Sequence, residues 1–427
     1  MHEDFLHHLW KYQKYNSDSE LKTNQGESLS IIEIGRHNQE NSGPDFFNAK
    51  VKIDGQVWAG NIEIHVKSSD WYAHNHQEDS AYDNVILHVV WEDDVEVFRR
   101  DNEIIPSFSL EKYVAHGTLE NYKSLIGIPS KHINCEKHFS SFDDFTISNW
   151  LERMYIERLE HKSNLIVDLL NESQNNWEDI LFKLLCKNFG LNKNGEVFLS
   201  LANQIPFKVI HKHHHSIKEL ESLLLGVSGL LNIKSEEKYI NDLKNEYEYL
   251  KHKYKLKESL LKPQFFRLRP DNFPSLRLAQ LASVYHKKPN LFQDIINIDS
   301  TEGFYKLFNV KLHGFWDIHY SLSKISNSKV KRLSKSFIDL LIINTILPLK
   351  LCYQKQRSAL DFENLLNIIS GIKAEKNSKI DIFESIRPNT NKTALESQAL
   401  LELKTNYCDK NYCLKCNLGK KLVNSSL

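Results

Sequence analysis

The sequence has neither an excess of charge nor a long apolar run. Lys+Arg and Asp+Glu each number 55, so the formal net charge is zero, and bulk charge does not predict a protein that coats nucleic acid. No stretch approaches the roughly eighteen consecutive apolar residues of a membrane helix, and residues 1–5 lack the basic and apolar regions of a signal peptide. These absences predict a cytoplasmic protein that contacts no membrane. Any contact with nucleic acid then depends on a local basic patch.

Cysteine is also scarce, because six cysteines are too few for a disulfide scaffold at 427 residues. Three of them, Cys408, Cys413 and Cys416, have C-x4-C-x2-C spacing near the end of the sequence. With one more ligand, such a group predicts a structural Zn²⁺ site or an iron–sulfur cluster, since an all-thiolate site leaves no open position for a substrate. Cys135 is the first candidate for the fourth ligand. The other candidates are Cys352, Cys186 and a histidine.

Apolar residues are present in sufficient number for real cores. Hydrophobic residues make up 41% and aromatic residues 11% of the chain, which excludes wholesale disorder. At roughly 150 residues per domain, the length corresponds to two or three domains. The patterns described next predict three parts: an α/β domain over 1–138, a helical domain over 139–400 and a cysteine knuckle over 401–427.

The residue pattern of the first part, 1–138, predicts a helix followed by strands. Residues 2–13 form an amphipathic helical pattern, and the strand-like runs are Ser28–Ile34, Phe46–Ile53, Val57–Val66, Val85–Trp91 and Val95–Phe98. Asp54-Gly55 between two of these runs is a strong hairpin signal. This order of a helix, a three-stranded meander, a short segment and a further strand predicts a compact α/β sandwich. The fold class is therefore α+β.

The apolar period changes to that of a helix from about residue 140. Ile147, Leu151, Tyr155, Leu159, Ile166 and Leu170 step mostly by four, which predicts one long amphipathic helix. Further helical patterns cover Trp177–Asn188, Ile217–Leu225, Glu236–Tyr254, Ser275–Tyr285, Ser336–Leu347 and Phe362–Ile369. The remainder of the chain is therefore predicted to be mostly helical.

A dense polar cluster lies in the predicted strands. Glu63, His65 and Lys67 alternate along one run and so share a face, where ionisable groups are costly unless they are solvated, paired or used. Asp45 opens the preceding strand of the hairpin. A two-residue turn would pair Asp45 with Ile64 and direct it to the other face, whereas a three-residue turn would pair it with His65. The sequence leaves both registers open, and a purely structural ion-pair network is the alternative to a metal site.

Two carboxylates beside a lysine suit a hydrolytic metal site. Carboxylate oxygens are hard ligands for Mg²⁺ or Mn²⁺, which polarise a phosphodiester and lower the pKa of bound water. Pro44-Asp45 followed by Glu63-x-x-x-Lys67 resembles the PD-(D/E)XK nuclease superfamily, whose helix, three-strand, helix, strand core matches the predicted order. The resemblance implies that Asp45 and Glu63 bind metal and that Lys67 is the catalytic lysine. That family places lysine two residues after the acid, where this chain has His65.

Histidines near the cluster suggest a second kind of metal site. His74 and His76 form a His-x-His pair, and His88 lies within the run Val85–Val90. Imidazoles suit transition metals such as Zn²⁺ or Mn²⁺, so a histidine-centred hydrolase site is an alternative to the Mg²⁺ site. The structural alternatives are surface positions for His74 and His76 and a hydrogen-bonded core position for His88.

Several segments together resemble one uncharacterised bacterial family, catalogued as domain of unknown function 2851. They are Gly43-Pro44-Asp45-Phe46, the run from Glu63 to Trp71, residues 85–90, residues 267–274 and residues 412–416. This resemblance spans the chain and implies no particular activity.

A basic, aromatic segment in the helical part is a candidate contact with nucleic acid. Arg267, Arg269 and Arg277 alternate with phenylalanines, and guanidinium groups bind phosphate while aromatic rings stack on bases. The structural alternative is a loop whose arginines pair with acids. The leading functional hypothesis is therefore a metal-dependent nuclease acting on DNA or RNA. The alternatives are a catalytically inactive nucleic-acid-binding or scaffold protein of the same fold, and a histidine-centred metal hydrolase with another substrate.

Overall fold

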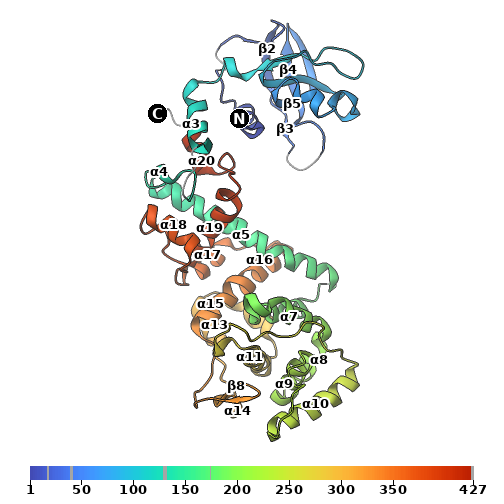
Figure 1. Cartoon of the computed structure of the whole chain (residues 1–427), viewed down its shortest axis with the longest axis vertical. Coiled ribbons are helices and arrows are strands. Elements are labelled where there is room, and N and C mark those ends of the chain that lie inside the picture. The colour runs from blue at the N-terminus through green and yellow to red at the C-terminus, as the bar shows by residue number, and fades with distance from the viewer. Residues whose placement is uncertain (17–18, 39–41, 128–131, 174, 425–427) are drawn as a thin grey trace. The chain divides into compact units, whose positions relative to one another are not determined.

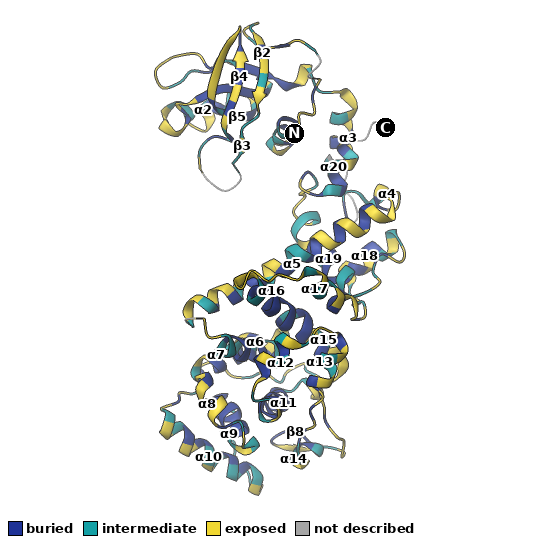
Figure 2. Cartoon of the chain, turned by 180° about the vertical axis from the view of Figure 1, so that it is seen from behind, coloured by how far each residue is buried: buried dark blue, intermediate teal, exposed yellow. Residues whose placement is uncertain are grey.

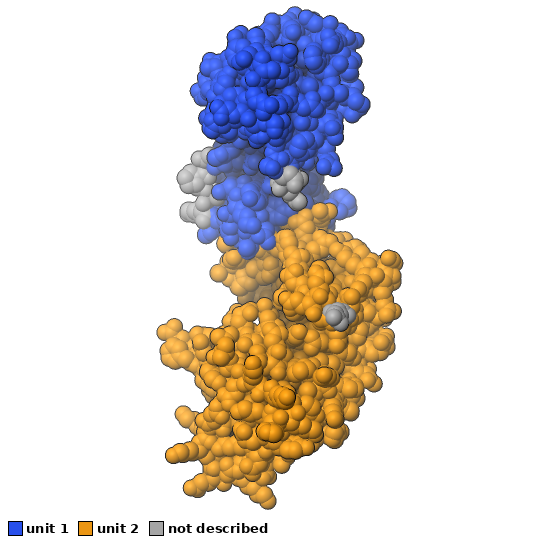
Figure 3. All heavy atoms as spheres, turned by 90° about the vertical axis from the view of Figure 1, so that its right-hand side faces the viewer, with its two compact units in different colours: residues 1–150, 403–427 blue, residues 151–402 orange. Residues whose placement is uncertain are grey.

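The computed structural model describes residues 1–427 except 17–18, 39–41, 128–131, 174 and 425–427 (Figure 1). The chain forms two compact units, coloured separately in Figure 3. Unit 1 contains residues 1–150 and 403–427, and unit 2 contains residues 151–402. The cysteine segment predicted as a separate part is therefore, from residue 403 onward, part of the same unit as the N-terminal strands.

Unit 1 is built on a mixed sheet. Its strands are β1 (Leu21–Lys22), β2 (Ser28–Glu33), β3 (Arg36–His37), β4 (Phe46–Ile53), β5 (Gln56–Lys67), β6 (Val85–Glu92) and β7 (Ser107–Ser109). They are arranged in the order β1-β2-β4-β5-β6-β7, with β3 beside β4. The pairs up to β4–β5 are antiparallel, whereas β5–β6 and β6–β7 are parallel. The predicted mixed α+β class is confirmed at this level.

The predicted strand Val95–Phe98 is wrong. In this segment only Phe98 makes a β-bridge, to Ile104, and the strand that follows β6 in the sheet is β7. The Asp94 carboxylate accepts hydrogen bonds from the hydroxyls of Ser68 and Ser69 (2.9 and 2.8 Å). These side-chain bonds hold the chain in a loop, an arrangement that competes with a strand ladder.

Short helices and turns complete unit 1. They are α1 (Glu3–Lys11), α2 (Asp70–Ala73), α3 (His116–Gly127), α4 (Glu136–Phe139) and α20 (Asn417–Asn424), with 3₁₀ turns η1 (His76–Glu78), η2 (Ser80–Tyr82) and η3 (Leu110–Lys112) and a π-turn η6 (Leu403–Cys408). The helix α5 (Asp144–Glu172) begins in unit 1 and continues into unit 2. The predicted helices over residues 2–13 and from residue 147 are confirmed by α1 and α5.

Two apolar layers enclose the central strands β5 and β6. One layer contains Phe5 and Trp10 of α1 together with Ile64, and Leu414 and Val423 of the C-terminal segment belong to it as well. The other layer is a separate cluster formed by Trp71, Tyr82, Val85, Val97 and Ile105. The polar residues of β5 that alternate with Ile64 therefore lie beside the second layer, next to α2 and the turns after it.

Unit 2 is mostly helical, as predicted. Its elements are α6 (Trp177–Phe189), α7 (Leu191–Gln204), α8 (Phe207–Lys212), α9 (Ile217–Val227), α10 (Lys238–Tyr254), η4 (Pro270–Asn272), α11 (Pro274–Lys287), α12 (Leu291–Asn297), α13 (Thr301–Leu307), α14 (Gly314–Asp317), α15 (Lys335–Leu341), a π-turn η5 (Ile342–Ile346), α16 (Leu347–Gln356), α17 (Phe362–Ser370), α18 (Ser378–Ile386) and α19 (Ala394–Glu402). A small hairpin pairs β8 (His319–Ser321) with β9 (Lys324–Ile325).

One helical run of unit 2 has the length and composition of a membrane span. It is Lys335–Gln356, which joins α15, η5 and α16, and 72% of its apolar window is buried within the protein. Figure 2 shows the α16 part of this run as largely buried. Burial of this extent is what the central helix of a helical core requires, because a helix that is apolar on all sides has to be covered.

Candidate metal centre

A β-bulge sets the register of the β4–β5 hairpin at the polar cluster. The turn has two residues, because Ile53 pairs with Gln56 around Asp54-Gly55. Nearer the cluster the register shifts, and Phe46 pairs with Ile62. Asn48 lies at this shift with a left-handed φ of 56°. Of the two turns that the sequence left open, the chain has the two-residue one, and the bulge nevertheless brings Asp45 beside Glu63.

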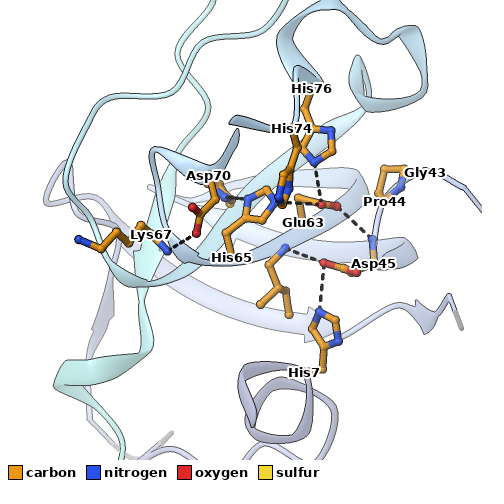
Figure 4. Close-up of polar contacts among 12 residues, drawn as sticks. His7, Gly43, Pro44, Asp45, Glu63, His65, Lys67, Asp70, His74 and His76 are labelled. Carbon is orange, nitrogen blue, oxygen red and sulfur yellow. Dashed lines mark hydrogen bonds and ion pairs between the residues drawn. The ribbon is translucent and has the colours of Figure 1, made fainter. Parts of the chain in front are cut away.

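Backbone N–H groups hold the carboxylates of Asp45 and Glu63. The Asp45 N–H donates to Glu63 Oε2 (3.1 Å), and the Ile64 N–H donates to Asp45 Oδ2 (2.9 Å). His7 of α1 places Nε2 3.2 Å from the same Asp45 oxygen (Figure 4). The sequence analysis missed His7, whose one available signal was its i,i+4 spacing from Glu3 on the polar side of the first helix.

Three histidine rings converge beside Glu63. One ring nitrogen from each of His65, His74 and His76 lies within 4.8 Å of the other two. His65 Nε2 lies 3.1 Å from His74 Nδ1. Glu63 Oε1 lies 3.5 Å from His65 Nε2 and 3.4 Å from His76 Nε2. His76 Nε2 is buried and forms no hydrogen bond within the protein, and it is directed toward the other possible metal ligands, with Glu63 Oε1 3.4 Å away.

A tight turn directs His74 and His76 toward β5. The helix α2 ends at Ala73, His74 is its C-cap, and Asn75 has a left-handed φ of 59° that turns the chain into η1. The His76 ring stacks on Tyr82 with the ring centroids 3.8 Å apart, and its face meets the edge of Trp71. These aromatic contacts fix the ring of His76 in the orientation that a metal ligand needs.

Burial determines the protonation states of Glu63 and His65 in the cluster. Burial, and then the nearby Asp45 carboxylate, raise the pKa of Glu63 to about 9. Burial, and then His88, lower the pKa of His65 to about 2, so its imidazole is neutral. Metal ions bind neutral imidazoles and ionised carboxylates. Glu63 is therefore protonated at neutral pH, and it would have to release this proton to bind a divalent cation, whose charge would offset that of the carboxylate.

His88, on the neighbouring strand β6, orients the ring of His65. His88 is fully buried on β6, and its Nε2 lies 2.8 Å from His65 Nδ1. If His65 Nδ1 carries the proton, the opposite nitrogen Nε2 faces His74 and Glu63 with its lone pair. A ring partner of this kind fixes the tautomer of a metal-ligating histidine. His88 is thus a hydrogen-bonded core residue and also a positioning residue for the cluster.

Lys67 lies apart from this cluster. Its side chain is 48% exposed, forms an ion pair with Glu92 (3.2 Å) and points away from Asp45 (Figure 4). The sheet alternation places Lys67 on the predicted face, but one step further along β5 than His65. The residue of that face nearest the carboxylates is therefore His65.

The three arginines of the predicted nucleic-acid contact differ in their surroundings. The Arg277 guanidinium lies 3.6 Å from the centroid of the Phe337 ring and donates to Asn272 Oδ1 (2.6 Å) and Gln280 Oε1 (2.9 Å). Arg267 and Arg269 are exposed. The contacts of Arg277 suit a structural role, and only the other two present their guanidinium groups to solvent.

Comparison with known proteins identifies the family but no characterised relative. Residues 3–378 match the model of the family described as protein of unknown function (DUF2851), and the chain belongs to that family. The cysteine segment 408–416 follows the matched residues. No curated protein and no solved structure matches the chain.

Proposed function

We propose that the protein is a metal-dependent hydrolase of phosphodiester bonds in DNA or RNA. In this proposal His65, His74, His76 and Glu63 bind one transition-metal ion such as Zn²⁺ or Mn²⁺. The observation that carries the proposal is the convergence of three histidine nitrogens within 4.8 Å of one another, with Glu63 Oε1 3.4–3.5 Å from two of them.

The ligand types favour a transition metal over Mg²⁺. Imidazole nitrogens suit Zn²⁺, Mn²⁺ and related ions, whereas Mg²⁺ prefers oxygen ligands and water. The Asp45 Oδ2 atom is already engaged by the Ile64 N–H and by His7. Glu63 instead directs Oε1 toward the histidines, so the ligand set is one carboxylate with several imidazoles.

The residues around the metal ligands can position and stabilise a phosphodiester. A bound transition metal supplies Lewis acidity and a more acidic water. Burial alone would lower the pKa of His7, but the hydrogen bond and charge of Asp45 raise it, and the net shift is upward. The protonated ring of His7 can therefore hold positive charge beside a phosphate, while Asp45 keeps that ring in place.

A basic cavity adjoins His7 and supports a phosphate-bearing substrate. The cavity has a volume of about 520 Å³, and His7 lies in its wall. Four lysines also line it: Lys11, Lys410, Lys415 and Lys420. Asp4 is the one acidic side chain among the described residues of its lining. Tyr12 and Tyr412 also line the cavity. Single-stranded nucleic acids bind such surfaces because their bases stack on aromatic rings and their phosphates interact with lysines.

The proposal of a nuclease also draws on the order of elements. When the two-residue strands β1 and β3 and the 3₁₀ turns η1 and η2 are left out, the order α1, β2, β4, β5, α2, β6 is compatible with the helix, three-strand, helix, strand order of the PD-(D/E)XK superfamily. In that comparison Asp45 and Glu63 take the positions of the two acids, and His65 takes the position of the lysine. A histidine there changes the expected metal and leaves the hydrolytic chemistry available.

Cleavage of labelled single- and double-stranded DNA and RNA tests the proposal. The wild type is assayed with Zn²⁺, Mn²⁺ or Mg²⁺ beside His65→Ala, His76→Ala and Glu63→Gln, with circular dichroism as a check on folding. We expect cleavage with a transition metal, reduced at least about 100-fold in the folded variants. Cleavage that persists in all three variants contradicts the proposed site. Binding without cleavage under every condition would instead support the inactive nucleic-acid-binding alternative.

A further inference from the structure

Four of the six cysteines gather in unit 1, far from one another in sequence. Cys408, Cys413 and Cys416 lie in the C-terminal segment, and Cys135 precedes α4. Asn134 Nδ2 lies 3.4 Å from Cys413 Sγ although 279 positions separate the two residues. Cys135 and Cys413 also pack against the same apolar cluster of unit 1.

The backbone around Cys413 and Cys416 forms a tight knuckle. The carbonyl oxygen of Tyr412 accepts the N–H groups of both Lys415 and Cys416 at 3.0 Å. A Cβ atom at Gly419 would lie 2.2 Å from the Cys413 carbonyl oxygen, so this close approach requires glycine. The helix α20 begins at Asn417, directly after the last cysteine. The turn thus holds two thiols three residues apart at the start of a helix.

Hydrogen-bond donors surround the sulfur atoms. The N–H groups of Leu418 and Gly419 donate to Cys416 Sγ, and the Asn134 amide donates to Cys413 Sγ. Donors directed at sulfur stabilise thiolates, and outer-shell donors of this kind accompany metal-bound cysteines. All six cysteines are free thiols. Leu418 and Gly419 lie in the first turn of α20, so Cys416 also caps this helix, and the donor that comes from another part of the chain is Asn134.

We propose that Cys135, Cys408, Cys413 and Cys416 together bind a structural metal centre, either one Zn²⁺ ion or an iron–sulfur cluster. This centre is separate from the histidine site and does not depend on the proposed hydrolysis. Among the described residues, no three cysteine sulfurs lie within 4.8 Å of one another. Binding of one zinc ion, with Zn–S bonds of about 2.3 Å, would draw the four sulfurs closer together. An iron–sulfur cluster would instead hold them on different irons, further apart.

The proposed centre fixes a segment that the basic cavity uses. Lys410, Tyr412 and Lys415 line that cavity, and all three lie between Cys408 and Cys416. Metal bonds at both ends of the segment would restrict its backbone and hold these side chains in the cavity wall. Cys135 would join the segment to the start of α4, within the same unit.

The test is the metal content of the full chain purified without oxygen. The His74→Ala/His76→Ala double variant serves as the background, so that histidine-bound metal does not contribute. Zinc and iron are measured by mass spectrometry, and the visible spectrum reports an iron–sulfur chromophore. We expect about one zinc ion or one cluster per chain. Cys135→Ser and Cys408→Ser should each abolish it, whereas Cys186→Ala and Cys352→Ala, which alter buried thiols of unit 2, should not.

A second measurement keeps the inference testable if a variant fails to fold. Co²⁺ is added to the metal-depleted parent chain, and thiolate-to-cobalt absorption is expected if the cysteines form a tetrahedral site. Zinc replaced by cobalt with thiolate bands, or a brown iron-containing chain, supports the centre. A chain that holds neither metal as purified, and shows no thiolate–cobalt absorption, overturns it. Full metal retention in Cys135→Ser overturns the assignment of the fourth ligand.

Discussion

At the scale of single residues, the orientation of His65 depends on one buried neighbour. His88 Nε2 is 2.8 Å from His65 Nδ1, and His88 is itself fully buried. His88 cannot bind the same ion through that nitrogen, because the nitrogen faces the far side of the His65 ring. Its contribution to metal binding is therefore indirect, through the tautomer and the rotation of His65.

We predict that His88→Ala weakens metal binding about 10- to 100-fold, the usual effect of removing an outer-shell partner. Competition with a chromophoric chelator measures the affinity for Zn²⁺ or Mn²⁺. His116→Ala is the matched control, because that ring lies on the surface with its side chain 83% exposed. Equal affinities for both variants and the wild type would show that His88 does not position a ligand.

The roles of His65 and Lys67 can be separated by substitution. Lys67 is bound to Glu92 at the surface, whereas His65 Nε2 faces His74 and Glu63. We predict that Lys67→Ala keeps cleavage within about threefold of the wild type, since loss of a surface ion pair has little energetic effect. His65→Ala should lose at least about 100-fold. A large loss in Lys67→Ala, measured as single-turnover cleavage, would instead assign catalysis to the lysine.

The residues of the site were predictable to different degrees. Glu63 and His65 could be found because strand alternation places them on one face, and His74 and His76 because they form a short His-x-His pair. Their convergence was not predictable, because it requires the left-handed Asn75 between them. His7 was missed because only tertiary packing of α1 against β5 brings it to Asp45. Local periodicity contains no such information.

At the scale of elements, the bulge in β4 determines whether the two carboxylates meet. Asn48 is exposed and adopts a φ of 56°, and its N–H donates to Asn61 Oδ1 (3.3 Å). Asparagine and glycine tolerate this conformation, whereas a β-branched residue does not. The hairpin turn was predictable from Asp54-Gly55, but nothing in the alternation of β4 marks a bulge at Asn48. The sequence therefore left two registers open.

We predict that Asn48→Ile destabilises unit 1 by about 1–2 kcal/mol, the cost of a left-handed conformation for such a residue. It should also weaken metal binding, because a relaxed bulge moves Asp45 out of register with Glu63. Asn48→Gly is the control and should change stability little, since glycine adopts the same φ without strain. Urea denaturation and chelator competition measure the two effects. An unchanged metal affinity in Asn48→Ile would show that the bulge does not set the site.

At the scale of the whole molecule, the division into units was only partly predictable. The change from strand to helical periodicity near residue 140 lies close to the boundary at residue 150. That the last 25 residues join unit 1 could not be deduced from periodicity, because the contacts of Leu414 and Val423 with the N-terminal core are long-range. The cysteine spacing was the one local signal, through the expectation that Cys135 lies near the tail.

The stability of unit 2 has a pH dependence of its own, set by a buried lysine. Lys162 Nζ donates to Gln398 Oε1 (2.7 Å) and Asn344 Oδ1 (2.9 Å). Burial, and then the Arg158 charge, lower the pKa of Lys162 to about 7, although Glu375 and Glu402 oppose this shift. Between about pH 7 and the ordinary lysine pKa near 10.4, the unfolded chain therefore binds more protons than the folded one. The contribution of Lys162 to folding stability therefore rises with pH across that window, and the full cost of its buried charge is present below pH 7.

We predict that the free energy of unfolding of unit 2 increases by about 2–4 kcal/mol between pH 7 and pH 10, and that Lys162→Met removes most of this slope. Methionine keeps an unbranched side chain but cannot ionise. The slope is the relevant quantity, because the lost hydrogen bonds to Gln398 and Asn344 shift the stability at every pH. Lys355→Met is the control, since Lys355 pairs with Glu160 (2.7 Å) and its side chain is 44% exposed. Hydrogen exchange of unit 2 amides in urea, repeated at each pH, measures the change. If the free energy of unfolding depends on pH equally in Lys162→Met, Lys355→Met and the wild type, Lys162 is charged in both the folded and the unfolded state. Its amide partners and the two glutamates would then stabilise the ammonium despite burial.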